Sequence, residues 1–127
     1  MILIFVIKWL KKKLIIMFNR KKIAKEFVHS LKSDKIYCAI LFGSVARNED
    51  TEQSDIDILI VTEDYLEIES EISEGIYNIG EYGELISAHV ITRETFNKTK
   101  NYSFLTRVLK EGINLMWIWR LYEKGLQ

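Results

Sequence analysis

The sequence predicts an α/β (α+β) fold in which helices pack on a small mixed β-sheet. Helical and strand-like apolar patterns alternate along the chain, and the strand-like runs are almost continuously apolar, as in strands covered on both faces. The chain has 127 residues, of which 48% are hydrophobic, and this suffices for one modest core. Because no internal repeat or proline-rich linker divides the sequence, we expect one folded domain.

The spacing of apolar residues sets the expected order of elements. Dense apolar runs predict strands at 35–42, 55–61, 85–91 and 113–119. Apolar residues recurring every three or four positions predict helices at 20–31, between Glu63-Asp64 and Gly80, and at 101–111. Residues suited to helix ends are Glu63-Asp64 and Thr92 at helix starts and Gly112 as a C-terminal stop.

Composition narrows the class of partner and the compartment. The chain has 18 basic and 18 acidic residues, so no global field attracts nucleic acid, and no DNA partner is expected. Cys38 is the single cysteine, which excludes an intrachain disulfide and a cysteine-based zinc site. Its apolar neighbours predict a small buried hydrophobe, and a reduced, cytoplasmic setting fits.

The first residues differ in character from the rest. Residues 1–16 combine an apolar run with Lys8 and the basic run 11–13, and we expect them to form an extension to a domain at 17–127. The apolar run is too short to span a bilayer, and it precedes its charges, unlike a secretory signal. Three interpretations stay open: a membrane-surface helix, a segment packed on the domain or on a partner, and an appendage before a start at Met17.

Two acidic residues open the second predicted strand. Side chains alternate along a strand, so Asp55 and Asp57 project from one face while Ile56 enters the core. Neighbouring carboxylates repel each other unless a cation lies between them, and Mg²⁺ typically takes one or two carboxylates plus phosphate oxygens. The pair therefore indicates a metal clamp for a nucleoside triphosphate. The alternative is that both acids are solvated at a loop end.

The end of the first strand favours the clamp. Gly43 allows the backbone to approach a phosphate closely, and Ser44 offers a hydroxyl and an N–H group. Arg47 adds a planar, permanently charged donor for phosphate or for the acidic loop. Each residue alone fits an ordinary turn or surface position, but their order before the two aspartates favours a shared site.

The run GSVARNEDTEQSDIDILIV, residues 43–61, resembles the signature of the DNA polymerase β-like nucleotidyltransferase superfamily. It is most similar to the minimal nucleotidyltransferases, whose pattern is Gly-Ser-x-Ala-Arg, a short gap, and then Ser-Asp-x-Asp-Leu. Those proteins pair with helical HEPN proteins, and some act as antitoxins that transfer AMP to the HEPN toxin. The specific match covers roughly residues 40–62, and the expected element order agrees with the family over most of the remaining chain.

The resemblance implies a set of roles. The triphosphate would be bound by Gly43, Ser44, Arg47 and Ser54. Asp55 and Asp57 would be catalytic and would hold Mg²⁺, with ATP as the substrate. An acceptor hydroxyl would attack the α-phosphorus with loss of pyrophosphate, and a HEPN-type protein is the implied partner.

The resemblance also implies a third carboxylate on the strand at 85–91, and here the pattern departs. Aligning the apolar run puts Ser87 where the acid is expected, and serine cannot replace a carboxylate as base or metal ligand. The nearest acid is Glu84, which strand parity places on the face opposite Ser87. His89 shares the Ser87 face and is the weaker candidate for a base. We expect Glu84 as the third catalytic residue, with a site lacking this acid as the alternative.

The sequence therefore supports two alternative functions. The first is a Mg²⁺-dependent nucleotidyltransferase, and the second is a catalytically weak or inactive antitoxin that acts by binding its partner. Trp117, Trp119 and Tyr122 add large apolar groups near the end of the chain. They favour a core position by default, with a partner surface or a homo-oligomer as the alternative.

Overall fold

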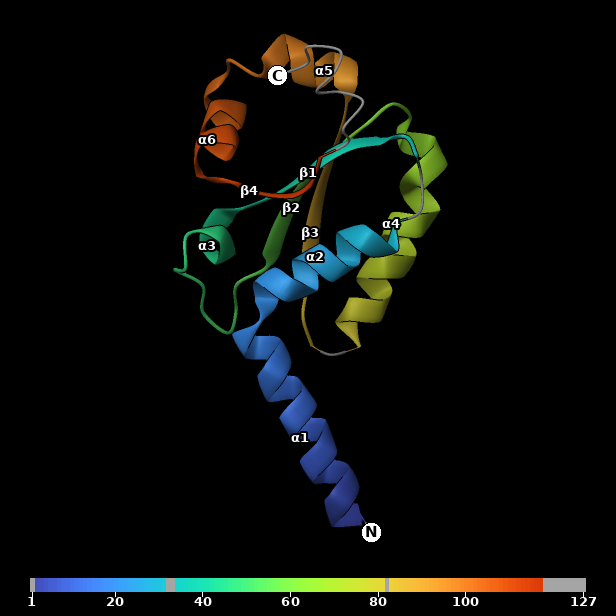
Figure 1. Cartoon of the computed structure of the whole chain (residues 1–127), viewed down its shortest axis with the longest axis vertical. Helices are drawn as coiled ribbons and strands as arrows, with labels where there is room; N and C mark the ends of the chain where they lie inside the picture. The colour runs from blue at the N-terminus through green and yellow to red at the C-terminus, as the bar shows by residue number, and fades with distance from the viewer. Residues whose placement is uncertain (1, 32–33, 82, 118–127) are drawn as a thin grey trace.

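The computed structural model describes residues 2–31, 34–81 and 83–117, and Figure 1 shows their arrangement. The strands are β1 (Ile36–Phe42), β2 (Ile56–Thr62), β3 (Ile86–Thr92) and β4 (Ile113–Trp117). The helices are α1 (Ile2–Phe18), α2 (Arg20–Ser30), α3 (Gly43–Ala46), α4 (Tyr65–Gly80), α5 (Arg93–Thr99) and α6 (Ser103–Glu111). Trp119 and Tyr122, for which a core position is predicted, lie outside the described residues.

The four strands form one mixed sheet in the order β3-β2-β1-β4. β1 is antiparallel to both β2 and β4, whereas β2 and β3 are parallel. A parallel pair needs a long connection, and α4 supplies it between β2 and β3. The predicted fold class, a small mixed sheet packed by helices, is confirmed.

Helices cover both faces of this sheet. On one face α2 and α4 pack through Phe27 and Ile68 against strand residues such as Ile58. On the other face Leu105 and Val108 of α6 contact a second apolar cluster. That cluster includes Cys38, which is buried as predicted. Because β1 and β2 are covered on both faces, their sequences are apolar at nearly every position.

Side-chain hydrogen bonds to backbone N–H groups stabilise the first turns of α4 and α5. The Asp64 carboxylate accepts a bond from the Leu66 N–H at 3.0 Å, and the Thr92 hydroxyl accepts one from the Thr95 N–H at 3.1 Å. Both predicted N-caps are confirmed. Gly112 ends α6 as predicted but for a different reason: its backbone is not left-handed, and a side chain there would collide with Ile40.

Packing between α2 and α4 depends on one small residue. A Cβ atom at Gly75 would lie 2.6 Å from Cε1 of Phe27, a ring that is almost fully buried. Glycine usually weakens a helix interior, so its presence here reflects the close approach of the aromatic ring. The two helices pack more closely at this point than a larger residue would permit.

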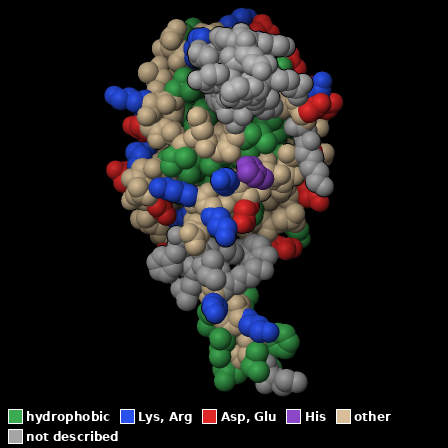
Figure 2. Space-filling view, in the orientation of Figure 1, with side chains coloured by type: hydrophobic (Ala, Val, Ile, Leu, Met, Phe, Trp, Pro, Cys, Tyr) green, Lys and Arg blue, Asp and Glu red, His purple; other side chains and the backbone are tan. Residues whose placement is uncertain are grey.

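The first helix leaves the body of the protein. α1 precedes Asn19, where the chain turns into α2, and Figure 1 shows it pointing away from the sheet. Apolar side chains along its first ten residues are exposed (Figure 2). In the part of the chain that the structure describes, no helix is both long and apolar enough to cross a membrane.

Candidate nucleotide and metal site

The predicted site residues meet at one end of the sheet. Phe42, the last residue of β1, pairs with Asp57 near the start of β2. On its other side Asp57 pairs with Ser87 of β3. This register brings the Gly43-Ser44 turn, Asp57 and the beginning of β3 side by side. The antiparallel β1–β2 pairing thus explains why a glycine and an aspartate 14 positions apart in sequence belong to one site.

Gly43 lies directly against the Asp57 carboxylate. Its φ of +77° is in the left-handed region that favours glycine. A Cβ atom at Gly43 would clash with Oδ2 of Asp57 and lie 3.2 Å from its Cγ. Two independent constraints therefore require glycine here. The chain then turns at once into the single turn of α3, which contains Ser44.

Asp57 is held in a partly buried setting. Its side chain is 28% exposed. Partial burial raises the pKa of this carboxyl, and the charge of Asp55 raises it further, whereas His89 and Arg47 oppose the rise. Asp55 precedes the strand and is exposed. The two predicted metal ligands are thus close enough for their charges to interact, and a cation would relieve the repulsion.

Ser54 forms hydrogen bonds within the loop between α3 and β2 and so stabilises the conformation of that loop. The Thr51 N–H donates to the Ser54 hydroxyl oxygen at 2.9 Å, and the Ser54 N–H donates to the Thr51 carbonyl at 3.0 Å. The structure therefore uses this hydroxyl to close the turn just before Asp55. Its predicted contact with nucleotide stays a prediction.

Arg47 follows α3 and is exposed. Its Nε donates to Glu49 at 3.0 Å, and Nη1 lies 3.6 Å from Glu111. Hydrogen bonding to Glu49 is the main cause that raises its pKa. Arg47 also acts electrostatically on Asp57. The guanidinium is thus at the site but paired with carboxylates, and its predicted contact with phosphate stays a prediction.

Glu84 is not brought to the site. Its carboxylate is buried and accepts a bond from Arg20 Nε at 2.9 Å, on the face of the sheet that α2 covers. Asp57 is on the opposite face, with His89 and Leu59. The structure therefore does not bring Glu84 together with Asp57, and its predicted role as the third catalytic carboxylate stays a prediction.

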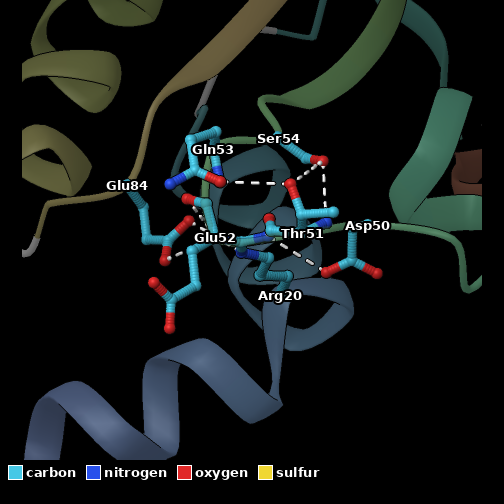
Figure 3. Close-up of polar contacts among 7 residues, drawn as sticks. All are labelled: Arg20, Asp50, Thr51, Glu52, Gln53, Ser54 and Glu84. Carbon is cyan, nitrogen blue, oxygen red and sulfur yellow. Dashed lines mark hydrogen bonds and ion pairs between the residues drawn. The ribbon is translucent and has the colours of Figure 1, made fainter.

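Arg20 is a residue that the sequence did not single out. All five of its N–H donors are used, by Glu84 twice, by Asp50, and by the carbonyls of Thr51 and Glu52. Figure 3 shows this guanidinium between α2, the loop and the start of β3. It holds the loop that leads to Asp55. In sequence Arg20 opens an Arg-Lys-Lys run, which gives no signal that the first residue is buried.

On the Asp57 face, His89 is the nearest titratable side chain of β3. Its Nε2 lies 3.9 Å from Oδ1 of Asp57 and 3.4 Å from the Ser87 hydroxyl. Phe42 and Phe104 contact the imidazole ring, with ring centroids 5.2 Å and 6.1 Å away. Sequence reasoning favoured Glu84 over His89 as the third group of the site. In the structure His89, and not Glu84, lies close to Asp57.

The carboxylate set is small. Within residues 2–31, 34–81 and 83–117, no three or more His, Cys, Asp or Glu side chains are grouped to hold a metal ion. The protein therefore offers Asp55 and Asp57 as a pair. Such a pair fits a hard cation whose remaining ligands are phosphate oxygens and water.

Comparison with models of known protein families shows which family this chain matches. Residues 20–113 match the model of the nucleotidyltransferase domain. The chain belongs to the nucleotidyltransferase domain family. The match begins at Arg20, the first residue of α2, and includes Gly43, both aspartates and His89. α1 lies before the matched range.

Other nucleotidyltransferases resemble the chain. A Methanocaldococcus jannaschii protein named putative protein adenylyltransferase is 45% identical over 97 residues, which cover 74% of this chain and 95% of that protein. The structure of a putative nucleotidyltransferase from Sulfolobus solfataricus superposes with a TM-score of 0.50 at 20% identity, over 84% of each chain. A toxin–antitoxin structure with AMP-PNP gives a TM-score of 0.52 at 18% identity, over 79% of this chain and 78% of that one. At these identities the two structures show the shared fold.

Proposed function

We propose that this nucleotidyltransferase transfers AMP from Mg·ATP to a hydroxyl group of a protein. The observation that carries the proposal is the contact between Gly43 and the Asp57 carboxylate, beside Asp55. Because Gly43 has no side chain, the Asp57 carboxylate lies directly against the Gly43-Ser44 turn, so the turn and the carboxylate can reach the same triphosphate. The 45% identical relative named as a protein adenylyltransferase supports the choice of AMP and of a protein acceptor.

The residues present fit a magnesium ion. Asp55 and Asp57 would hold it, since both are acidic oxygen donors and Asp57 has a pKa raised in part by its neighbour. The bound ion would neutralise charge on the triphosphate and on the departing pyrophosphate. Because Glu84 is separated from Asp55 and Asp57, the remaining coordination positions of the ion would be left to substrate oxygens and water.

The chain's own groups account for binding and orientation. The Gly43-Ser44 turn receives the triphosphate, with backbone N–H and the Ser44 hydroxyl as donors. The acceptor oxygen forms a bond to the α-phosphorus while the bond to the bridging oxygen of pyrophosphate breaks, and the proton of the acceptor hydroxyl passes to His89 Nε2. His89 Nε2 faces Asp57, so it is placed to accept a hydrogen bond from the acceptor hydroxyl. The buried Arg20 keeps the loop before Asp55 in place.

A HEPN-type toxin is the proposed acceptor protein. The residues 43–61 resemble the minimal nucleotidyltransferases that pair with HEPN proteins, and a toxin–antitoxin structure shares the fold. A second function is also supported by a specific observation: the third carboxylate predicted on β3 is replaced by Ser87 opposite Asp57. The alternative is an antitoxin that acts by binding its partner with little or no transfer.

Labelling separates the two functions. The full chain is incubated with Mg²⁺, α-labelled ATP and a HEPN-type protein from its own source. We expect label on the HEPN protein, lost in Asp57→Asn and Asp55→Asn. Glu63→Gln is the matched control, because Glu63 is an exposed acid just beyond the other end of β2. A stable complex with no label, unchanged by either aspartate substitution, would establish the binding function instead.

A further inference from the structure

The first helix presents an apolar surface with no equivalent on the rest of the described chain. Exposed fractions along its first turns run from 44% at Val6 to 81% at Ile2. The exposed apolar residues of this segment include Ile2, Leu3, Ile4, Phe5, Val6, Ile7 and Leu10. Figure 1 shows α1 leaving the body, and Figure 2 shows hydrophobic side chains on the visible face of its projecting part, beside Lys side chains. Contiguous exposed apolar surface of this kind marks an interaction site.

The surface is apolar on every side of the helix. Six successive apolar residues, 2–7, advance by about 100° each and so surround the helix axis. A helix that binds a protein groove or a coiled-coil partner has one apolar stripe and a polar back. Residues 2–7 have no polar back. Their surroundings must be apolar in all directions, as the acyl region of a bilayer is.

The charges that follow define the kind of bilayer. Lys8 and Lys11 are exposed directly after the apolar turns, and the sequence continues with Lys12 and Lys13. Residues 1–18 contain no Asp or Glu, whereas the whole chain has 18 acidic and 18 basic residues. The remainder of the chain therefore has a net negative charge, and α1 is its cationic element. Lysine near a surface of anionic lipid is attracted to the headgroup phosphates.

The length of the apolar part suits insertion without crossing. Six helical residues rise about 9 Å, far less than the roughly 30 Å of a bilayer's hydrocarbon core, so this segment can enter one leaflet without crossing. No described helix is long and apolar enough to span a membrane. Lysine stems can lie along apolar surroundings while their ammonium groups stay in water, so Lys8 marks the level of the headgroups.

We propose that α1 binds the protein reversibly to the surface of an anionic lipid bilayer. Residues 2–7 enter the acyl region of one leaflet, and Lys8 and Lys11 contact the headgroup phosphates. This binding is independent of the proposed AMP transfer, because α1 precedes Arg20, where the nucleotidyltransferase match begins, and none of its described side chains belongs to the site around Asp57.

Vesicle sedimentation tests the proposal with the full chain. Vesicles of phosphatidylcholine alone are compared with vesicles in which about a third of the lipid is phosphatidylglycerol, at low salt. We expect partition into the anionic vesicles only. Phe5→Glu should lower that partition at least tenfold, and Lys8→Gln with Lys11→Gln should lower it about fivefold per lysine.

Matched controls come from exposed residues elsewhere. Leu66→Glu changes an apolar residue of α4 that is 76% exposed, and the pair Lys22→Gln with Lys25→Gln removes two exposed charges from α2. Both controls should partition like the unchanged chain, and circular dichroism should confirm that every variant is folded. The proposal is wrong if the unchanged chain stays in the supernatant with anionic vesicles or partitions equally into neutral ones. It is also wrong if Phe5→Glu only dissolves an oligomer, since α1 would then bind a second copy of the chain.

Discussion

Arg20 and Glu84 form a buried ion pair across the α2 face of the sheet, with Nε and Oε2 2.9 Å apart and each side chain about 5–6% exposed. The pair links the first turn of α2 to the start of β3. The same guanidinium donates to the carbonyls of Thr51 and Glu52, so the ion pair also holds the loop that ends at Asp55. Glu84 is thus linked to this loop through Arg20, and we expect it to act as a positioning residue.

Loss of this carboxylate should reduce stability far more than it reduces chemistry. Glu84→Leu leaves the buried Arg20 with Asp50 as its remaining carboxylate partner, which costs up to about 3–5 kcal/mol in the free energy of unfolding. The measurement is urea denaturation. Glu81→Leu is the control, because Glu81 is exposed at the end of α4 and should change stability by less than about 0.5 kcal/mol.

Activity separates this role from direct catalysis. Glu84→Gln keeps the shape of the side chain and one acceptor for Arg20. At a temperature where this variant is folded, its kcat for AMP transfer should stay within about threefold of the unchanged protein. A loss of a hundredfold or more in kcat with unaltered stability would mean that Glu84 contacts reacting groups, against the placement described above.

The sheet could be predicted because its physical signal is strong and local. β1 and β2 are buried on both faces, so apolar residues fill almost every position and their limits are clear to within one or two residues. α3 could not be predicted in this way. Its four residues, 43–46, are too few to show a helical period, and its tight turn depends on the left-handed Gly43.

The candidate site was predictable in part. Spacing and residue type brought together Gly43, Asp55 and Asp57, which the fold places at one end of the sheet. Strand parity showed that Glu84 and Ser87 face opposite sides but not which side faces Asp57. The pairing of Asp57 with Ser87 shows that Ser87, and not Glu84, shares the face of Asp57. A local sequence pattern does not reveal the register between strands that are distant in sequence.

Gly75 should be intolerant of even one added methyl group. The Cβ of Gly75→Ala would press on the buried Phe27 ring, and such overpacking costs about 1–3 kcal/mol, offset by up to about 1 kcal/mol of helix propensity. Thermal or urea unfolding measures the difference. In the same helix Gly80→Ala meets nothing within 4 Å, so it should be neutral or stabilising. Equal stability of the two variants would contradict the close packing of α2 on α4.

The buried thiol of Cys38 should be unreactive in the folded protein. Burial raises its pKa from 9.0 to about 12, so almost no thiolate exists at pH 8. We expect no reaction with a thiol-specific chromophore at pH 8 until urea unfolds the chain. Rapid labelling of the native protein would contradict the burial.

The same shift makes stability depend on alkaline pH. Because the folded-state pKa is raised, the contribution is complete below pH 9 and is lost as pH rises toward 12, by about 1.4 kcal/mol per pH unit. Unfolding free energies measured between pH 8 and pH 11 should show this decline. Cys38→Val lacks the ionisable group, so its stability should decline less steeply over that range.

Gly43 and Gly83 offer a matched pair that separates backbone strain from the shape of the site. Both have φ near +80°, so alanine at either position costs about 1–2 kcal/mol of stability. A Cβ at Gly83 meets nothing within 4 Å, whereas one at Gly43 displaces the Asp57 carboxylate. We therefore expect Gly83→Ala to keep AMP transfer and Mg·ATP affinity, and Gly43→Ala to lose at least tenfold in both. Calorimetric titration with Mg²⁺ and a non-hydrolysable ATP analogue measures the affinity. Similar affinity in both variants would show that the approach of Gly43 to Asp57 does not shape the nucleotide site.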